Sequence, residues 1–272
     1  MLLCNHLTIG YGAKVIQRDL SFSLESGEMV CMLGRNACGK STLLRTLAGL
    51  QPPLGGEFRL GEAGNPSKTV ALVLSSDEAI ERTTVHDVVA MGRYPYTSLL
   101  GKLTPDDEQV IEESLVAVGF EEQGTKNQTY PDFSGEPRAK TFLESPFMAH
   151  SDGEKQRILI AKALAQQTPI ILLDEPTAHL DLPNRIRVLQ LLRSLAHKEG
   201  KTILISTHEL DLAVRLSDRI LLMSPLEASQ QAGTPAHPDA PQQGIQLATP
   251  QELIEEGAFT KAFGLNPFAL QL

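Results

Sequence analysis

Short apolar runs alternate along the chain with longer stretches in which apolar residues recur every three or four positions. The runs predict buried strands, and the periodic stretches predict helices with one apolar face. Strands are expected in pieces within 2–33, the last of them the apolar run 29–33, and then at 70–74, 170–173, 202–206 and 219–223. Helices are expected directly after Ser41, within 84–120, over 151–167 and 183–197, and from residues 209 and 249 onward. Strands that alternate with helices imply a parallel sheet covered on both faces, so we expect an α/β fold.

Residues that favour helix starts support three of these helices. A Thr-Pro pair begins at Thr104 and another at Thr249, and each places a capping residue before a proline in the first helical turn. Ser151 and Glu154 form the S-x-x-E pattern of a capping box. We therefore expect helices to begin at these three points.

Two segments lack any periodic pattern. Residues 121–149 collect Gly, Pro and Ser, which predicts an unusually long loop. Residues 225–248 are rich in Pro, Gln, Ala and Gly, which is typical of a flexible linker. No repeat at a solenoid period is visible.

Composition narrows the class of protein. The chain has 272 residues, of which 42% are hydrophobic, enough for a packed core. A net charge of −9 and an isoelectric point near 5.3 provide no positive field that would attract nucleic acid or an anionic membrane. The longest apolar runs fall far short of the roughly 18 residues that span a bilayer, and we expect no secretory signal at the start. Three cysteines without CxxC spacing fit a reduced cytoplasm.

A glycine-rich loop between the strand at 29–33 and the next helix carries the clearest chemistry. It matches G-x-x-x-x-G-K-[ST], whose backbone N–H groups surround phosphates at a helix N-terminus. Lys40 is expected to reach the β- and γ-phosphates, and the Ser41 hydroxyl to bind Mg²⁺. The alternative is a glycine-rich turn with a surface lysine. The loop residues expected to bind a nucleotide are Gly34, Arg35, Asn36, Ala37, Cys38, Gly39, Lys40, Ser41 and Thr42.

Two acids end the apolar strand in the segment IILLDEP. Asp174 is expected to hold a magnesium ion through water, and Glu175 to polarise an attacking water molecule. Many strands end in acids, so the segment is a weak signal alone. Downstream of the glycine-rich loop it becomes a strong one.

Four segments occur in a fixed order: GRNACGKST, HSDGEKQR, LLDEPTAHLD and STHEL. Over nearly its whole length the chain resembles the nucleotide-binding subunits of ATP-binding cassette (ABC) transporters. The resemblance implies a P-loop NTPase (RecA-like) core with an N-terminal antiparallel β subdomain and an inserted α-helical subdomain. It also implies that two copies enclose two ATP molecules head to tail.

The resemblance divides a single ABC ATPase domain, 1–272, into parts. The core lobe takes two segments, and a helical subdomain is inserted between them with an extra loop. The expected parts are a core at 1–84 and 151–224, a helical subdomain at 85–150 with its loop at about 121–149, a linker at 225–248, and a C-terminal helix and tail at 249–272.

The segment HSDGEKQR resembles the family's signature motif, which faces the γ-phosphate held by the other copy. This implies that Ser151 and Gly153 contact the partner's nucleotide. Asp152 replaces the first glycine of the usual LSGGQ and His150 replaces its leucine. An acid in the first turn stabilises a helix but opposes phosphate, so we expect Asp152 to point aside. The alternative is a helix cap without a binding role.

Other roles follow from the resemblance one position at a time. Tyr11 matches the aromatic residue that stacks on adenine, although a tyrosine there could also be simply packed or exposed. Asp181 matches the loop that contacts the other copy. His208 matches the histidine that contacts the γ-phosphate, and it joins Glu175 and Lys40 as an expected catalytic residue. Ser75 stands where the family has a glutamine, and it could reach the metal ion through water.

The segment VHDVVAMGRYPY, residues 85–96, resembles importers of iron–siderophore complexes, haem and vitamin B12. Its specific part is Gly92, Arg93, Tyr94 and Pro95. The resemblance implies that ATP and Mg²⁺ drive a homodimer at the cytoplasmic face of the inner membrane. The implied partners are transmembrane permease subunits and, indirectly, a periplasmic or lipoprotein substrate-binding protein. No nucleic acid partner is expected.

Two alternatives remain open at this point. A soluble ABC ATPase of DNA repair or translation would use the same nucleotide site, although the chain has no coiled-coil insertion and no second cassette. A P-loop kinase would leave HSDGEKQR and STHEL unexplained.

Cys38 adds one expectation. It lies in the glycine-rich loop, close to a helix N-terminus and to Lys40, and such surroundings lower the pKa of a thiol. We therefore expect a reactive thiol that ATP protects from alkylation.

Overall fold

The computed structural model describes residues 1–61, 66–74, 82–98, 101–120, 128–131, 137–225 and 244–264. The chain forms two compact units. The first, the core unit, comprises Met1–Leu72, Pro169–Pro176 and Leu192–Leu272. The second, the helical unit, comprises Val73–Thr168 and Thr177–Leu191.

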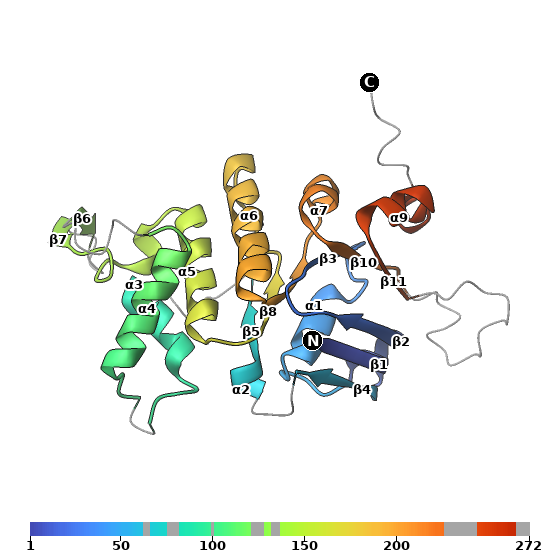
Figure 1. Cartoon of the computed structure of the whole chain (residues 1–272), viewed down its shortest axis with the longest axis horizontal. Coiled ribbons are helices and arrows are strands. Elements are labelled where there is room, and N and C mark those ends of the chain that lie inside the picture. Colours follow the sequence, from blue (N-terminus) through green and yellow to red (C-terminus); the bar gives the residue numbers. More distant parts are fainter. Residues whose placement is uncertain are drawn as a thin grey trace. The chain divides into compact units, whose positions relative to one another are not determined.

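A six-stranded sheet forms the centre of the core unit, in the order β11-β10-β3-β9-β8-β5 (Figure 1). Strands β10, β3, β9 and β8 pair in parallel, and β11 runs antiparallel to β10. β3, β8 and β9 are buried along their full length, as expected for a parallel sheet covered on both faces. The bounds are β3 (Met29–Gly34), β5 (Val70–Val73), β8 (Ile170–Asp174), β9 (Thr202–Ser206), β10 (Arg219–Met223) and β11 (Ile245–Ala248). The predicted α/β fold is confirmed.

A three-stranded antiparallel sheet precedes and flanks the first helix, in the order β2-β1-β4. Its strands are β1 (Leu2–Tyr11), β2 (Lys14–Leu24) and β4 (Gly55–Leu60). Alternate side chains of β1 and β2 join one apolar cluster with Leu43, Leu44 and Leu47 of α1 (Lys40–Leu47). This confirms the predicted N-terminal antiparallel subdomain and the predicted apolar face of the helix.

Side chains of β3 alternate between the two faces of the large sheet. Val30 and Met32 join the α1 cluster, whereas Cys31 and Leu33 pack with the C-terminal helices on the other face. The helices on that face are α7 (Leu210–Leu216), α9 (Pro250–Glu255) and α10 (Ala258–Phe263). Among the described residues, the core unit also includes α2 (Pro66–Thr69) and part of α6 (Leu182–Glu199), which has residues in both units.

The end of the predicted linker is a strand. Residues 245–248 form β11, which pairs with Ile220–Met223. Ile245 and Leu247 pack against the α1 cluster, and burial of these two side chains explains the strand despite a linker-like composition nearby. Residues 226–243 of the predicted linker lie outside the described residues.

The helical unit is built from α3 (Val85–Ala90), the 3-10 helix η2 (Met91–Arg93), α4 (Pro105–Ala117) and α5 (Asp152–Ala165). α5 packs against α3 and α4, so it belongs to this unit, whereas the sequence analysis ended the helical subdomain at residue 150. The segment predicted as a loop at 121–149 contains regular structure. It includes an antiparallel pair, β6 (Gln128–Pro131) and β7 (Pro137–Lys140), and the 3-10 helix η3 (Phe147–Ala149).

The three helix starts that the sequence predicts are confirmed, and each has a capping box, which the sequence predicts only at Ser151. The side chains of Thr104, Ser151 and Thr249 each accept a hydrogen bond from the backbone N–H three residues later. In return, the acidic side chain at that later position accepts a hydrogen bond from the backbone N–H of the capping residue. No helix among the described residues is both long enough and apolar enough to cross a bilayer.

Arg93 holds the helical unit together from a buried position. Its guanidinium donates to Asp107 Oδ1 at 2.8 Å, to the Ala165 carbonyl at 2.7 Å and to Gln167 Oε1 at 2.8 Å. Thr104, through its backbone N–H and hydroxyl, and then Arg93 lower the pKa of Asp107 to about 2. Gly92 allows the close approach, because a Cβ there would lie 2.3 Å from the Lys162 carbonyl oxygen. Two residues of the GRYP segment thus have a packing role.

We expect Arg93→Ala to lower the free energy of unfolding by roughly 3–5 kcal/mol, because it leaves a buried carboxylate and a carbonyl without their donor. Urea unfolding measures the change. Arg59→Ala is the matched control, since Arg59 pairs with Glu57 on the exposed face of β4. Such an exposed pair is worth at most about 1 kcal/mol. Equal effects of the two substitutions would contradict the structural role of Arg93.

Candidate functional site

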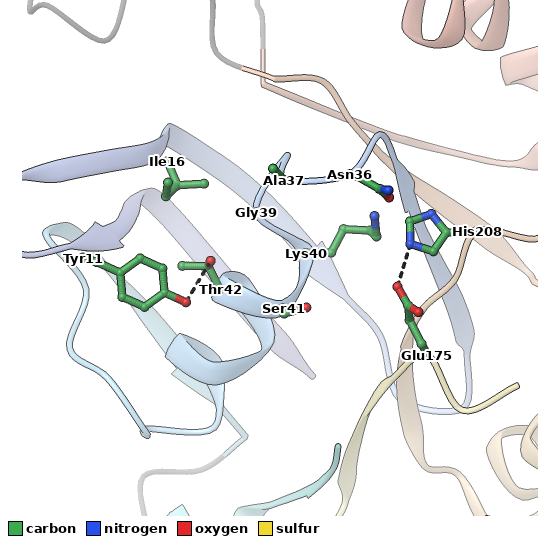
Figure 2. A pocket seen from close by; sticks show the side chains of 10 residues that line it. All are labelled: Tyr11, Ile16, Asn36, Ala37, Gly39, Lys40, Ser41, Thr42, Glu175 and His208. Atoms are coloured by element: carbon green, nitrogen blue, oxygen red, sulfur yellow. Dashed lines mark hydrogen bonds and ion pairs between the residues drawn. The ribbon is translucent and has the colours of Figure 1, made fainter. Parts of the chain in front are cut away.

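One pocket of the core unit gathers many of the residues singled out from the sequence (Figure 2). Its volume is about 330 Å³, within the range of small-molecule sites. It is lined by Tyr11, Ile16, Asn36, Ala37, Gly39, Lys40, Ser41, Thr42, Glu175 and His208. The glycine-rich loop and the ends of β8 and β9 therefore contribute to one hollow.

The two glycines of the loop are required by close approach. A Cβ on Gly34 would lie 2.5 Å from the Met223 carbonyl oxygen. Gly39 has a φ of +105°, and a Cβ there would lie 2.8 Å from Ile16 Cγ2. Only glycine fits both positions without a shift of the neighbouring strands.

Lys40 lies along the loop rather than in solvent. Its ammonium group donates to the Gly34 carbonyl at 2.9 Å, and the residue is buried. Backbone N–H groups at the start of α1 and this ammonium together make the loop end of the pocket electropositive. Such a surface suits phosphate oxygens.

Glu175 and His208 meet in the same pocket. The Nε2 atom of His208 lies 2.6 Å from Oε1 of Glu175, within hydrogen-bonding distance (Figure 2). Glu175 follows β8 directly and has a φ of +51°. For a residue other than glycine, this left-handed conformation costs about 1–2 kcal/mol. Strain of this kind is concentrated at functional sites, which agrees with the predicted role of Glu175.

Asp174 and Ser41 provide the oxygen atoms that could hold a metal ion. Asp174 ends β8 and is buried, and Ser41 lines the pocket. Carboxylate and hydroxyl oxygens are the ligands that Mg²⁺ prefers, and Mg²⁺ usually retains water and substrate oxygens besides one or two protein ligands. The described residues contain no group of three or more His, Cys, Asp or Glu that could hold a metal ion. Asp174 is not among the residues that line the pocket, and its Oδ1 accepts a hydrogen bond from Ser206. Ser75 lies outside the described residues.

Tyr11 lies at the rim of the pocket, and the residue is 48% exposed. Its hydroxyl accepts a hydrogen bond from Thr42 Oγ1 at 3.3 Å. Sequence reasoning missed Ile16, which lines the pocket beside Gly39. It also missed Gln17, a fully buried residue whose Nε2 donates to the Cys38 carbonyl at 2.8 Å and to the Ser224 carbonyl at 2.7 Å.

The signature residues belong to the helical unit. Ser151 caps α5 as predicted, and Gly153 packs against Asn184, whose Cγ would lie 3.1 Å from a Cβ at position 153. The backbone N–H of Asn184 donates to Asp181 Oδ1 at 3.0 Å. Within this unit, the start of α5 and the start of α6 are therefore neighbours.

The two unusual residues of the signature segment have structural partners. Asp152 is exposed, and its Oδ1 accepts a hydrogen bond from Lys155 at 3.3 Å. His150 is buried with its Nε2 atom 2.7 Å from Ser145 Oγ and its ring edge-on to Phe142. Burial lowers the pKa of His150. His150 is thus buried in the core at the position where the usual signature motif has leucine.

The prediction that Cys38 has a reactive thiol of lowered pKa is wrong. Its thiol is buried, and burial raises its pKa more than the nearby Lys40 ammonium lowers it. The side chain does not line the pocket, because it packs inward on the apolar cluster around α1. Cys38 contributes to the structure of the loop through its backbone, since its carbonyl accepts a hydrogen bond from Gln17.

Comparison with known proteins agrees with the geometry. Residues 17–178 match the family described as ABC transporter. The chain is 35% identical to the iron(3+)-hydroxamate import ATP-binding protein FhuC of Bacillus subtilis, over 82% of this chain and 78% of FhuC. It is 37% identical to the achromobactin transport ATP-binding protein CbrD of Dickeya dadantii, over 85% of this chain and 81% of CbrD. A solved structure described as an ABC transporter of the metal-chelate type, in an inward-facing conformation, superposes on this chain with a TM-score of 0.75 at 27% identity. The match covers 97% of this chain and 89% of that one.

We expect Cys38 to react slowly with iodoacetamide in the native protein, with or without ATP, because a buried thiol of raised pKa provides little exposed thiolate. Mass spectrometry of tryptic peptides measures the labelling, and the urea-unfolded chain gives the reference rate. Fast native labelling that ATP suppresses would show that the thiol faces the nucleotide after all.

Proposed function

The chain belongs to the ABC transporter family, and on that premise we propose that it is the ATP-hydrolysing subunit of an importer for a metal chelate. The observation that carries the proposal is the pocket that unites Lys40, Ser41, Glu175 and His208. It brings together the glycine-rich loop, a carboxylate and a histidine within hydrogen-bonding distance of that carboxylate. Family members with these parts are ATPases.

In this proposal, the residues of the pocket and the adjoining Asp174 would supply each part of ATP hydrolysis. The loop N–H groups and Lys40 would bind the β- and γ-phosphates, and Tyr11 would stack on the adenine at the rim. Ser41 and Asp174 would hold Mg²⁺, which neutralises phosphate charge. Glu175 would accept a proton from the attacking water, and the 2.6 Å contact with His208 would keep its carboxylate oriented.

A second copy of the chain would complete the site. We assign Ser151, Gly153 and Asp181 to contacts across an ATP-bound homodimer. Support comes from the start of α5, where the capping box occupies the backbone N–H groups of Ser151 and Glu154 and leaves those of Asp152 and Gly153 without an acceptor inside the helix. ATP would close the dimer and hydrolysis would open it.

The membrane partners follow from the relatives. Two of them are named for import of iron(3+)-hydroxamate and transport of achromobactin. We therefore propose that the chain binds transmembrane permease subunits at the cytoplasmic face of the inner membrane, and that a substrate-binding protein delivers the cargo. An iron–siderophore complex is the favoured cargo, with haem and cobalamin as other members of the same class.

We expect Glu175→Gln to lower ATP turnover by about 100-fold or more, the usual contribution of a general base. The variant keeps its phosphate-binding loop, so it should bind ATP and accumulate as a dimer. Turnover assays and light scattering at saturating Mg-ATP measure both properties. Glu57→Gln on exposed β4 is the matched control and should leave both unchanged. A Glu175→Gln variant that hydrolyses ATP normally, or that stays monomeric, would exclude the assigned base or the dimer.

A further inference from the structure

A buried serine at the end of β9 contacts both acids that follow each other at the end of β8. The Ser206 hydroxyl donates to Asp174 Oδ1 at 2.5 Å. The same hydroxyl oxygen accepts from the Glu175 backbone N–H at 3.0 Å, and the Ser206 carbonyl accepts from that N–H at 3.1 Å. We propose that Ser206 is a positioning residue, which fixes the carboxylate of Asp174 and the backbone turn of Glu175 at once.

The direction of these hydrogen bonds follows from the chemistry of the groups. A carboxylate and a carbonyl can only accept, and a backbone N–H can only donate. The single hydrogen of the Ser206 hydroxyl therefore points to Asp174, and one of its lone pairs faces Glu175. No other arrangement satisfies all three groups.

The contact explains how the strained conformation of Glu175 persists. Its φ of +51° turns the chain abruptly after β8, and both acceptors that hold its N–H come from Ser206. With its backbone held in this way, the Glu175 side chain enters the pocket, where it meets His208. Strained residues persist when their surroundings over-determine them, as Ser206 does here.

Packing alone does not explain why a serine occupies position 206. Ser206 pairs directly with Asp174 in the parallel ladder, and it ends a strand whose preceding residues 203–205 are all aliphatic and buried. An aliphatic residue would satisfy burial at this position but would leave Asp174 without its donor. The hydroxyl is the feature that the two acids use.

The inference rests on the proposed ATP hydrolysis at this pocket, and it can be tested separately. We expect Ser206→Ala to lower kcat about 10- to 100-fold, as for a catalytic group that is no longer held in place. ATP binding without metal should stay near the wild-type affinity, because the loop is untouched. The Mg²⁺ concentration needed for tight ATP binding, measured by calorimetry, should rise because Asp174 is no longer oriented.

Two further variants separate positioning from stability. Ser217→Ala removes another buried serine hydroxyl of the core unit, which donates to the Ala213 carbonyl at 2.6 Å, and it should lower the Tm without these changes in kcat or Mg²⁺ dependence. Ser206→Thr retains the hydroxyl and should restore most of kcat. If the alanine variant fails to fold, Ser206→Cys provides a side chain of similar shape with only a weak hydrogen-bond donor. We expect this variant to have a lower kcat than the wild type.

The outcomes distinguish this inference from the proposed function. A Ser206→Ala or Ser206→Cys variant with wild-type kcat and Mg²⁺ dependence would overturn the positioning role while the ATPase assignment stands. The positioning role would also be overturned if Ser217→Ala had the same Tm as Ser206→Ala and lost kcat to the same extent. A wild-type chain that neither binds nor hydrolyses Mg-ATP would instead overturn the proposed function itself.

Discussion

Parallel pairing of β10, β3, β9 and β8 brings the carboxyl ends of these strands to one edge of the sheet, and the pocket depends on that constraint. The glycine-rich loop follows β3, the two acids end and follow β8, and the serine and histidine end and follow β9. The loop precedes the two acids by more than a hundred residues, and 32 positions separate Asp174 from Ser206, yet the register places the three segments together. Packing on both sheet faces favours that register, because a shift by one residue would move every side chain to the opposite face and disrupt its close packing.

Buried polar side chains then lock the local geometry. Gln17 holds the loop through the Cys38 carbonyl, and Ser206 holds the acids at the end of β8. Within the helical unit, Arg93 performs the same task for α4 and α5. Each of these side chains loses hydration on burial and makes two or more hydrogen bonds in its place, although Oε1 of Gln17 has no partner. Losing one partner would leave the other groups unsatisfied, so such positions tolerate little change.

Local sequence signals predicted much of this arrangement. The strand and helix pattern, the three N-terminal caps and the glycine-rich loop are all readable from neighbouring residues. Contacts between distant residues were not readable: Gln17 reaches Ser224 across 207 positions, and Ser206 reaches Asp174 across 32. Cys38 misled for a related reason. The charge of Lys40 is visible in the sequence, whereas the burial that outweighs it depends on how β1, β2 and α1 pack.

Whether this pocket powers the import of a metal chelate can be measured on the native assembly. The tagged protein would be purified from gently solubilised membranes of its own cells, its companions identified by mass spectrometry, and ATP turnover measured with iron–siderophore complexes, haem and cobalamin. Our account predicts a polytopic membrane partner and turnover that one of these cargoes stimulates. A protein recovered only from the soluble fraction, bound to nucleic acid or ribosomes, would contradict it.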